Sequence, residues 1–213
     1  MVELLTRPRG RSLSAGRLFG FDPPDRPTVD VRPLLARQRE RDRQSQFHPP
    51  EPASRYLADP RFIVGLACPT EVLGSVKRNE DGTRQRTRFD ADAFDAFLWE
   101  LHRGLRTVAL WLRHNEGREI GDTTDHDGRF LRVFLGERGL MFAIDTETAR
   151  GSIVRSLVRR RPEEFGECSI GAFELDHTDH HQAGGVVVRH VHLAMPREIS
   201  LVPRGSMPGT WIR

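Results

Sequence analysis

Three residues whose types suit acyl transfer lie far apart in the chain. Ser169 sits among small and apolar residues in the stretch 166–172, at the start of an expected strand. His114 lies two residues after an apolar run of strand length that ends at Leu112, and Glu198 precedes the last apolar stretch of the chain. A serine hydroxyl becomes a nucleophile when an imidazole takes its proton and a third group orients the imidazole. The three residues therefore predict a catalytic triad, provided that the fold brings the ends of their strands together.

Each member of this set also has a reading without catalysis. A serine at the entrance of a strand often only satisfies a turn, and a histidine at the end of a strand is commonly an ordinary polar residue. Glu198 can simply pair with the neighbouring Arg197 on the surface. The distances between the three side chains decide between these readings.

A second cluster of polar residues has the composition of a metal site. Imidazole and carboxylate groups of this kind bind zinc, and the last two histidines share one face of a strand because side chains alternate. The cluster comprises Asp176, His177, Asp179, His180, His181, His190 and His192. Residues 176–185 are expected to form the tip of a hairpin, where a solvated polar surface is normal. The sequence analysis therefore favours no metal and no other cofactor, with a zinc-dependent hydrolase as a third hypothesis.

Composition describes an ordinary water-soluble chain. It has 213 residues, of which 37% are hydrophobic and 30% charged, enough apolar material for one sizeable core. No run of about 18 apolar residues and no secretory signal are present, so a cytoplasmic location without membrane contact is expected. The two cysteines, Cys68 and Cys168, form no disulfide framework or C-x-x-C pair and are expected to be buried apolar residues.

The first 57 residues differ in composition from the rest of the chain. They hold eight of the fourteen prolines and no sustained apolar period, which predicts a largely disordered basic arm with at most one short helix near 31–44. Its arginine run at 37–43 is interrupted by Glu40 and Asp42, which argues against nucleic acid as a partner. Residues 58–213 are expected to form the folded domain.

Within that domain the apolar pattern predicts mostly strands. Apolar residues at positions 94, 97, 98 and 101 predict a helix, with Asp90 or Asp92 near its cap, and Thr146 or Thr148 is expected to cap a second helix. Residues 130–144 predict a hairpin, and residues 117–121 a turn. The expected strands are 62–68, 107–112, 130–135, 140–144, 169–175 and 186–195, with a last apolar stretch at 199–202. The fold class is therefore mainly β with flanking helices, α+β.

The order of these motifs resembles the prohead maturation proteases of tailed bacteriophages, which are related to the assemblins of herpesviruses. The resemblance covers about residues 60–213. It is carried by the strand 108–112 followed by Arg113-His114-Asn115, by Cys168-Ser169-Ile170-Gly171-Ala172, and by the closing block 197–205. It implies a compact antiparallel β-barrel flanked by helices, with Ser169 as nucleophile and His114 as base.

The resemblance also implies the remaining roles and the biology. Glu198 matches the third member in the phage block, whereas assemblins use a second histidine, so His190 and His192 remain alternatives. Arg204 and Ile170 are candidates for stabilising the oxyanion. The implied function is cleavage of scaffolding protein or major capsid protein, and of the enzyme itself, inside the prohead in the host cytoplasm. A non-catalytic capsid-assembly or scaffold-binding protein of the same fold is the alternative, and dimerisation is left open.

Overall fold

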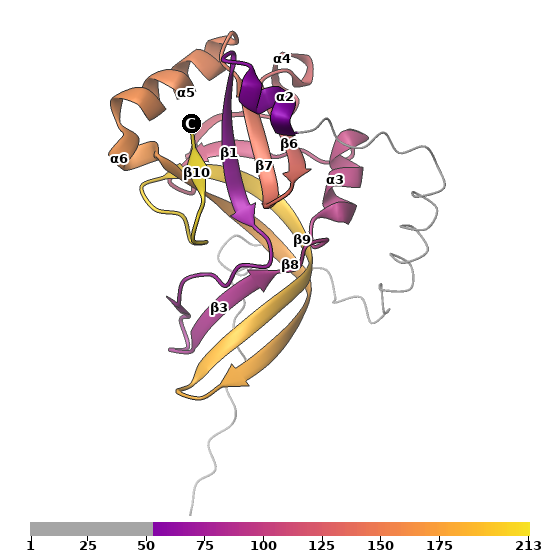
Figure 1. The fold of residues 1–213 in the computed structure, drawn as a ribbon, viewed down its shortest axis with the longest axis vertical. Helices are drawn as coiled ribbons and strands as arrows, with labels where there is room; N and C mark the ends of the chain where they lie inside the picture. Colours follow the sequence, from indigo (N-terminus) through magenta and orange to yellow (C-terminus); the bar gives the residue numbers. More distant parts are fainter. Residues whose placement is uncertain (1–52) are drawn as a thin grey trace, which may run out of the picture. The chain divides into compact units, whose positions relative to one another are not determined.

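The computed structural model describes residues 53–213, which form a mainly β structure with short helices (Figure 1). This confirms the predicted α+β class. The strands are β1 Phe62–Pro69, β2 Lys77–Arg78, β3 Arg84–Phe89, β4 Ala109–Leu112, β5 Asn115–Asp122, β6 Leu131–Gly136, β7 Gly139–Asp145, β8 Glu167–Gln182, β9 Val186–Val202 and β10 Trp211–Ile212. The helices are α2 Ala53–Ala58, α3 Asp95–His102, α4 Asp125–Gly128, α5 Ala149–Arg160 and α6 Pro162–Phe165.

The first sheet has the strand order β10-β1-β7-β6 and is antiparallel throughout. Its centre, β7, is buried along its whole length, because it has a strand on each side and packing on both faces. The hairpin of β6 and β7 turns at residues 136–139, as predicted from the glycines there. The predicted strand ending at Pro69 is confirmed as β1.

The second sheet is built around β9, a strand of 17 residues. β8 pairs with it antiparallel, whereas β3 and β4 pair with it in parallel, at residues 186–191 and 198–201 respectively. Figure 1 shows the long β8–β9 hairpin extending away from the first sheet, with β3 beside it. The expected compact antiparallel β-barrel is not seen in the described residues: β9 has two parallel partners besides its antiparallel one, and neither sheet closes.

The hairpin is longer than its sequence suggested. The predicted tip at 176–185 is wrong: β8 continues to Gln182, and only residues 183–185 form the turn. Polar residues there resemble a loop, but they pair across the strands, as where Arg189 binds both carboxylate oxygens of Asp179 at 2.8 Å. In the same way the expected turn at 117–121 lies inside β5, which is exposed for most of its length.

Helices pack on the core that the two sheets share. In α3 the side chains of Phe94, Phe97 and Leu98 are buried, which confirms the predicted apolar face. The expected cap is wrong, because a turn at residues 91–94 precedes the helix and Phe94 occupies the cap position without a side-chain hydrogen bond. In α5, the Thr148 hydroxyl accepts a hydrogen bond from the Gly151 N–H at 3.0 Å, so the predicted cap is confirmed.

Both cysteines are free and buried, as expected. Burial raises the pKa of both thiols far above the usual range, so they remain protonated and behave as small apolar groups. Cys168 also donates to the carbonyl oxygen of Leu66 at 3.0 Å, which joins β8 to β1. This contact fixes the strand that carries Ser169 against the first sheet.

Most of the predicted N-terminal arm, including the suggested helix at 31–44, lies outside the described residues. Its last residues belong to α2, whose Tyr56 is buried and packs on Phe62 and Phe134 with ring centroids 5.0 and 5.1 Å apart. The packed structure therefore includes residues before position 58. Among residues 53–213 no helix is long and apolar enough to cross a membrane.

Candidate active site

His114 lies in a two-residue turn between β4 and β5. Leu112 pairs with Asn115, and the two turn residues, Arg113 and His114, have φ angles of 56° and 55°. Two-residue hairpin turns need positive φ at both central positions. Residues other than glycine adopt this backbone conformation only at a cost in free energy. The N–H of Arg113 donates to the Leu201 carbonyl at 3.0 Å, which ties the turn to β9. The imidazole is thus held at the end of a buried strand while 46% of its side chain stays exposed.

Glu198 orients this imidazole from β9. Its Oε1 lies 2.7 Å from Nδ1 of His114, although the carboxylate is only 2% exposed. A buried carboxylate at this distance accepts a hydrogen bond from Nδ1–H, and in that tautomer Nε2 carries the free lone pair. His114 is therefore set up to take a proton at Nε2, while Glu198 would support the positive charge that results.

Ser200 holds both partners in place. Its hydroxyl donates to Oε2 of Glu198 at 2.5 Å and accepts from the backbone N–H of His114 at 3.0 Å. Glu198 and Ser200 are two residues apart on one strand, so their side chains share a face. Both carboxylate oxygens thus have a partner, which compensates for the cost of burying the charge.

Ser169 lies on the neighbouring strand and on the same face of the sheet. It is paired in register with Ser200, and Gly171 is paired with Glu198. The Ser169 side chain is 3% exposed, and its Oγ lies 3.2 Å from Oγ of Ser206. Within the described residues no hydrogen bond joins Ser169 to His114. The structure therefore brings Glu198 to His114 and leaves Ser169 beside them, bonded to another hydroxyl.

A β-bulge lies next to this site. Gly171 faces Glu198 but Ala172 faces Pro196, so Arg197 is an extra residue on β9. Bulges bend a strand and redirect its side chains, and they are frequent beside active sites. Here the guanidinium of Arg197 lies over the Trp111 ring, 4.8 Å from its centroid.

The other predicted site residues lie elsewhere. Arg204 follows the end of β9 and is exposed, without a hydrogen bond or ion pair to any described residue. Ile170 directly follows Ser169, so its N–H is near the nucleophile candidate, while its side chain packs on the core. The structure assigns no oxyanion contact to either residue.

The alternative histidines are remote from His114. His192 precedes Glu198 by six residues, roughly 20 Å along a strand. Its Nδ1 lies 2.6 Å from Asp90 Oδ2, and its Nε2 lies 2.9 Å from Thr178 Oγ1. The His190 ring packs near His180, with centroids 4.7 Å apart. These histidines connect strands of the hairpin, and the structure does not place them as partners of His114.

The zinc hypothesis gains no support from the geometry. Among residues 53–213 no group of three or more His, Cys, Asp and Glu side chains is arranged to hold a metal ion. Five residues of the cluster lie along β8 and two along β9, where they pair across the hairpin instead of converging on one point. The arrangement at His114 offers acid–base chemistry with the chain's own groups.

Two hydroxyl residues of the site were not predicted from the sequence. Ser200 had a usable signal, because a glutamate and a serine two residues apart in a strand share a face. Ser206 had none, since it lies in the loop after β9 and reaches Ser169 only through the fold.

Comparisons of the chain with models of known protein families, with curated proteins and with solved structures found no match. The chemical interpretation of the site therefore rests on the residues and distances described above.

Proposed function

We propose that the protein is a serine endopeptidase that uses Ser169, His114 and Glu198. The observation that carries this proposal is the buried Glu198 carboxylate, 2.7 Å from His114 Nδ1, on a strand whose neighbour presents Ser169 on the same face. A surface histidine rarely has a fully buried carboxylate as partner, because burying the charge costs free energy. The arrangement is that of a general base next to a candidate nucleophile.

The proposed reaction begins with a rotation of the Ser169 hydroxyl from Ser206 toward Nε2 of His114. As Oγ attacks the carbonyl carbon of a peptide bond, Nε2 takes the hydroxyl proton and Glu198 stabilises the imidazolium. The C–N bond then breaks, and Nε2 returns the proton to the leaving amine. Water attacks the acyl-enzyme ester in the same way, releasing the acid product and the free serine.

The proposed biological role follows the motif resemblance. The enzyme would cleave scaffolding protein or major capsid protein, and itself, inside an assembling phage head in the host cytoplasm. The kinship with the assemblin type of fold is part of this proposal and is supported by the order of the motifs 108–115, 166–172 and 197–205. The open sheets of the described residues would then be a variant of that barrel.

A second candidate function is a capsid-assembly or scaffold-binding protein of the same fold without catalysis. Its specific support is the state of Ser169, which is almost fully buried and hydrogen-bonded to Ser206. A serine-directed phosphonate probe separates the two candidates. Labelling of wild-type protein that is lost in Ser169→Ala supports the protease, whereas no labelling supports the binding protein.

The decisive test is co-expression of the full chain with the capsid and scaffolding proteins from the same genome, followed by mass spectrometry. We expect trimmed products with the wild type and uncut substrates with Ser169→Ala or His114→Ala. Ser152→Ala on α5 and His181→Ala on β8 serve as matched controls, since both residues lie outside the site. Normal processing by Ser169→Ala or His114→Ala would overturn the assignment.

A further inference from the structure

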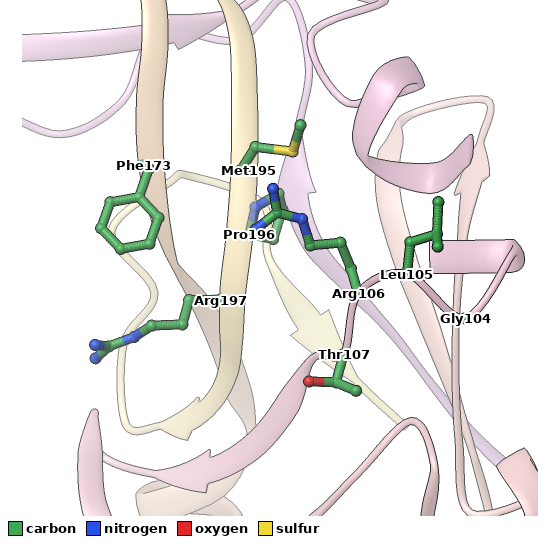
Figure 2. Close-up of a pocket in the computed structure, with 8 residues that line it drawn as sticks. All are labelled: Gly104, Leu105, Arg106, Thr107, Phe173, Met195, Pro196 and Arg197. Carbon is green, nitrogen blue, oxygen red and sulfur yellow. The ribbon is translucent and has the colours of Figure 1, made fainter. Parts of the chain in front are cut away.

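A pocket of about 280 Å³ lies beside β8 and β9, the strands that carry Ser169 and Glu198. It is formed by the loop between α3 and β4 together with the middle of the β8–β9 hairpin. Figure 2 shows Phe173, Met195 and Arg197 on the two strands, with Leu105 and Arg106 on the loop.

The pocket lies close to the site along both strands. Phe173 shares the β8 face with Ser169 and Gly171, because all three alternate along an unbroken stretch of that strand. It lies roughly 13 Å from Ser169 along β8, about the length of four residues of an extended peptide. On β9, Arg197 directly precedes Glu198. An extended chain whose scissile bond lies at Ser169 can therefore reach the pocket.

The lining exposes apolar side chains that a folded protein normally buries. Leu105 is 63% exposed and Phe173 is 60% exposed, and the partly buried Met195 also lines the pocket. Large apolar groups gathered around a hollow commonly mark a binding surface. The pocket is thus suited to a large apolar side chain of a ligand.

The charges of the pocket point to an acidic ligand. The lining includes two arginines and no acidic residue. Arg106 is paired with Glu100 at 2.6 Å, whereas Arg197 is stacked on Trp111 and has no carboxylate partner among residues 53–213. An arginine that lies over an aromatic ring and has no carboxylate partner keeps its N–H groups free to bind a carboxylate of a ligand.

We propose that this pocket is a recognition subsite for the protein substrate. It binds an extended segment in which a large apolar residue is flanked by acidic residues, the apolar side chain between Leu105 and Phe173 and a carboxylate on Arg197. The assignment of this segment to the substrate rests on the proposed proteolysis. The binding itself does not, and it can be measured without cleavage.

The test uses the full chain with Ser169→Ala, so that no peptide is cut. The probe is a fluorescein-labelled ten-residue peptide with one central leucine and two glutamates on each side of it, followed by fluorescence anisotropy. We expect saturable binding that weakens about tenfold or more when Arg197→Gln or Phe173→Ser is added. The same peptide with lysines in place of glutamates should bind with an affinity at least about tenfold lower.

Matched control variants remove similar groups elsewhere. Arg132→Gln on β6 and Ile153→Ser on α5 lie outside the pocket, both are exposed, and neither should change the affinity. The proposal is overturned if the acidic peptide does not bind, if the lysine peptide binds equally well, or if Arg197→Gln has no effect. Binding without any processing of capsid or scaffolding protein would reject the proteolysis and keep the pocket. Processing without peptide binding would reject the pocket alone.

Discussion

The carboxylate of Glu198 is the most constrained group of the candidate site. It is 2% exposed, and each of its oxygens accepts one hydrogen bond, from His114 and from Ser200. A buried charge with fewer partners would be strongly unfavourable. His114, Glu198 and Ser200 therefore form one hydrogen-bonded network. Removing the charge of Glu198 is expected to change which nitrogen of the His114 ring carries the proton more than it changes the packing.

Glu198→Gln tests this at the level of one residue. The substituted amide is nearly isosteric but favours the wrong imidazole tautomer, so processing of the capsid substrate should fall roughly 10³- to 10⁴-fold. The rate is measured by quantitative mass spectrometry of trimmed termini. Glu116→Gln, an exposed change on β5, is the control and should leave the rate unchanged. A loss below tenfold for Glu198→Gln would contradict the proposed role.

At the level of elements, the pairing of β8 with β9 leaves no room above Gly171. A Cβ at this position would lie 2.4 Å from Oε1 of Glu198, the oxygen that binds His114. Such a contact forces the carboxylate to move. The glycine therefore allows the charge to lie flat against the neighbouring strand.

Gly171→Ala should displace the carboxylate and lower the processing rate about a hundredfold while the protein stays folded. The rate and the thermal midpoint are measured together. Gly117→Ala on β5 is the matched control, because its Cβ would meet only the Asn115 side chain at 3.3 Å. Full activity of Gly171→Ala would show that the position of Glu198 is not critical.

The β4–β5 turn combines function with backbone strain. Arg113 and His114 both have positive φ, a conformation that disfavours residues with ordinary side chains. Asparagine tolerates this conformation well, and it is common in such turns. Arg113 and His114 therefore occupy turn positions whose positive φ angles disfavour their residue types.

Arg113→Asn should therefore stabilise the fold by about 1 kcal/mol, which raises the thermal midpoint by about 2–4 °C. The change also removes the exposed ion pair of Arg113 with Glu164, at 2.6 Å. Glu164→Gln removes that pair, together with the longer contact of Glu164 with Arg161 at 3.6 Å, and serves as the control, with an expected effect of less than about 1 kcal/mol. A lower midpoint for Arg113→Asn than for Glu164→Gln would contradict the interpretation of strain.

On the scale of the whole molecule, β9 connects the candidate site with the distal hairpin. The same strand carries Glu198 and Ser200 at one end and His190 and His192 toward the other. Desolvation, followed by the nearby His180 and Arg88, lowers the pKa of His190 below its usual value. Its charged form is thus less favourable in the folded state than in the unfolded chain.

Stability should consequently fall as His190 is protonated. This destabilisation is absent above the pKa of the unfolded chain, near 6.5. It grows as the pH falls through that value toward the lower pKa of the folded state. His190→Gln should reduce the loss of unfolding free energy between about pH 7 and about pH 5, measured by urea denaturation. His126→Gln, on α4, is the control for removing an imidazole. An unchanged pH dependence in His190→Gln would contradict the prediction.

A different acidic transition is expected for Asp179 on the same hairpin. Its hydrogen bonds with Arg189 lower its pKa, so this carboxylate stabilises the fold above its unfolded value, near 3.9, and loses that contribution at lower pH. The two effects therefore fall in separate pH ranges and do not confuse the histidine measurement.

Local signals were sufficient for several elements. The glycines at 136 and 139 indicated the β6–β7 hairpin, and Thr148 indicated the start of α5. Local signals failed where pairing overrides composition. The polar residues 176–182 looked like a loop but form a strand, because β9 supplies hydrogen bonds and side-chain partners along their whole length.

By itself, the sequence determined the mainly β class, the buried strand before His114 and the three residues worth testing as a triad. The class and the strand follow from apolar periodicity, which acts over a few neighbouring residues, whereas the triad follows from residue types and from the motif resemblance. Only the tertiary structure decided that Glu198 meets His114, that Ser200 bridges them and that Ser169 bonds to Ser206. These contacts depend on strand direction and register between residues 37 to 86 positions apart, where burial and pairing of the whole chain set the outcome.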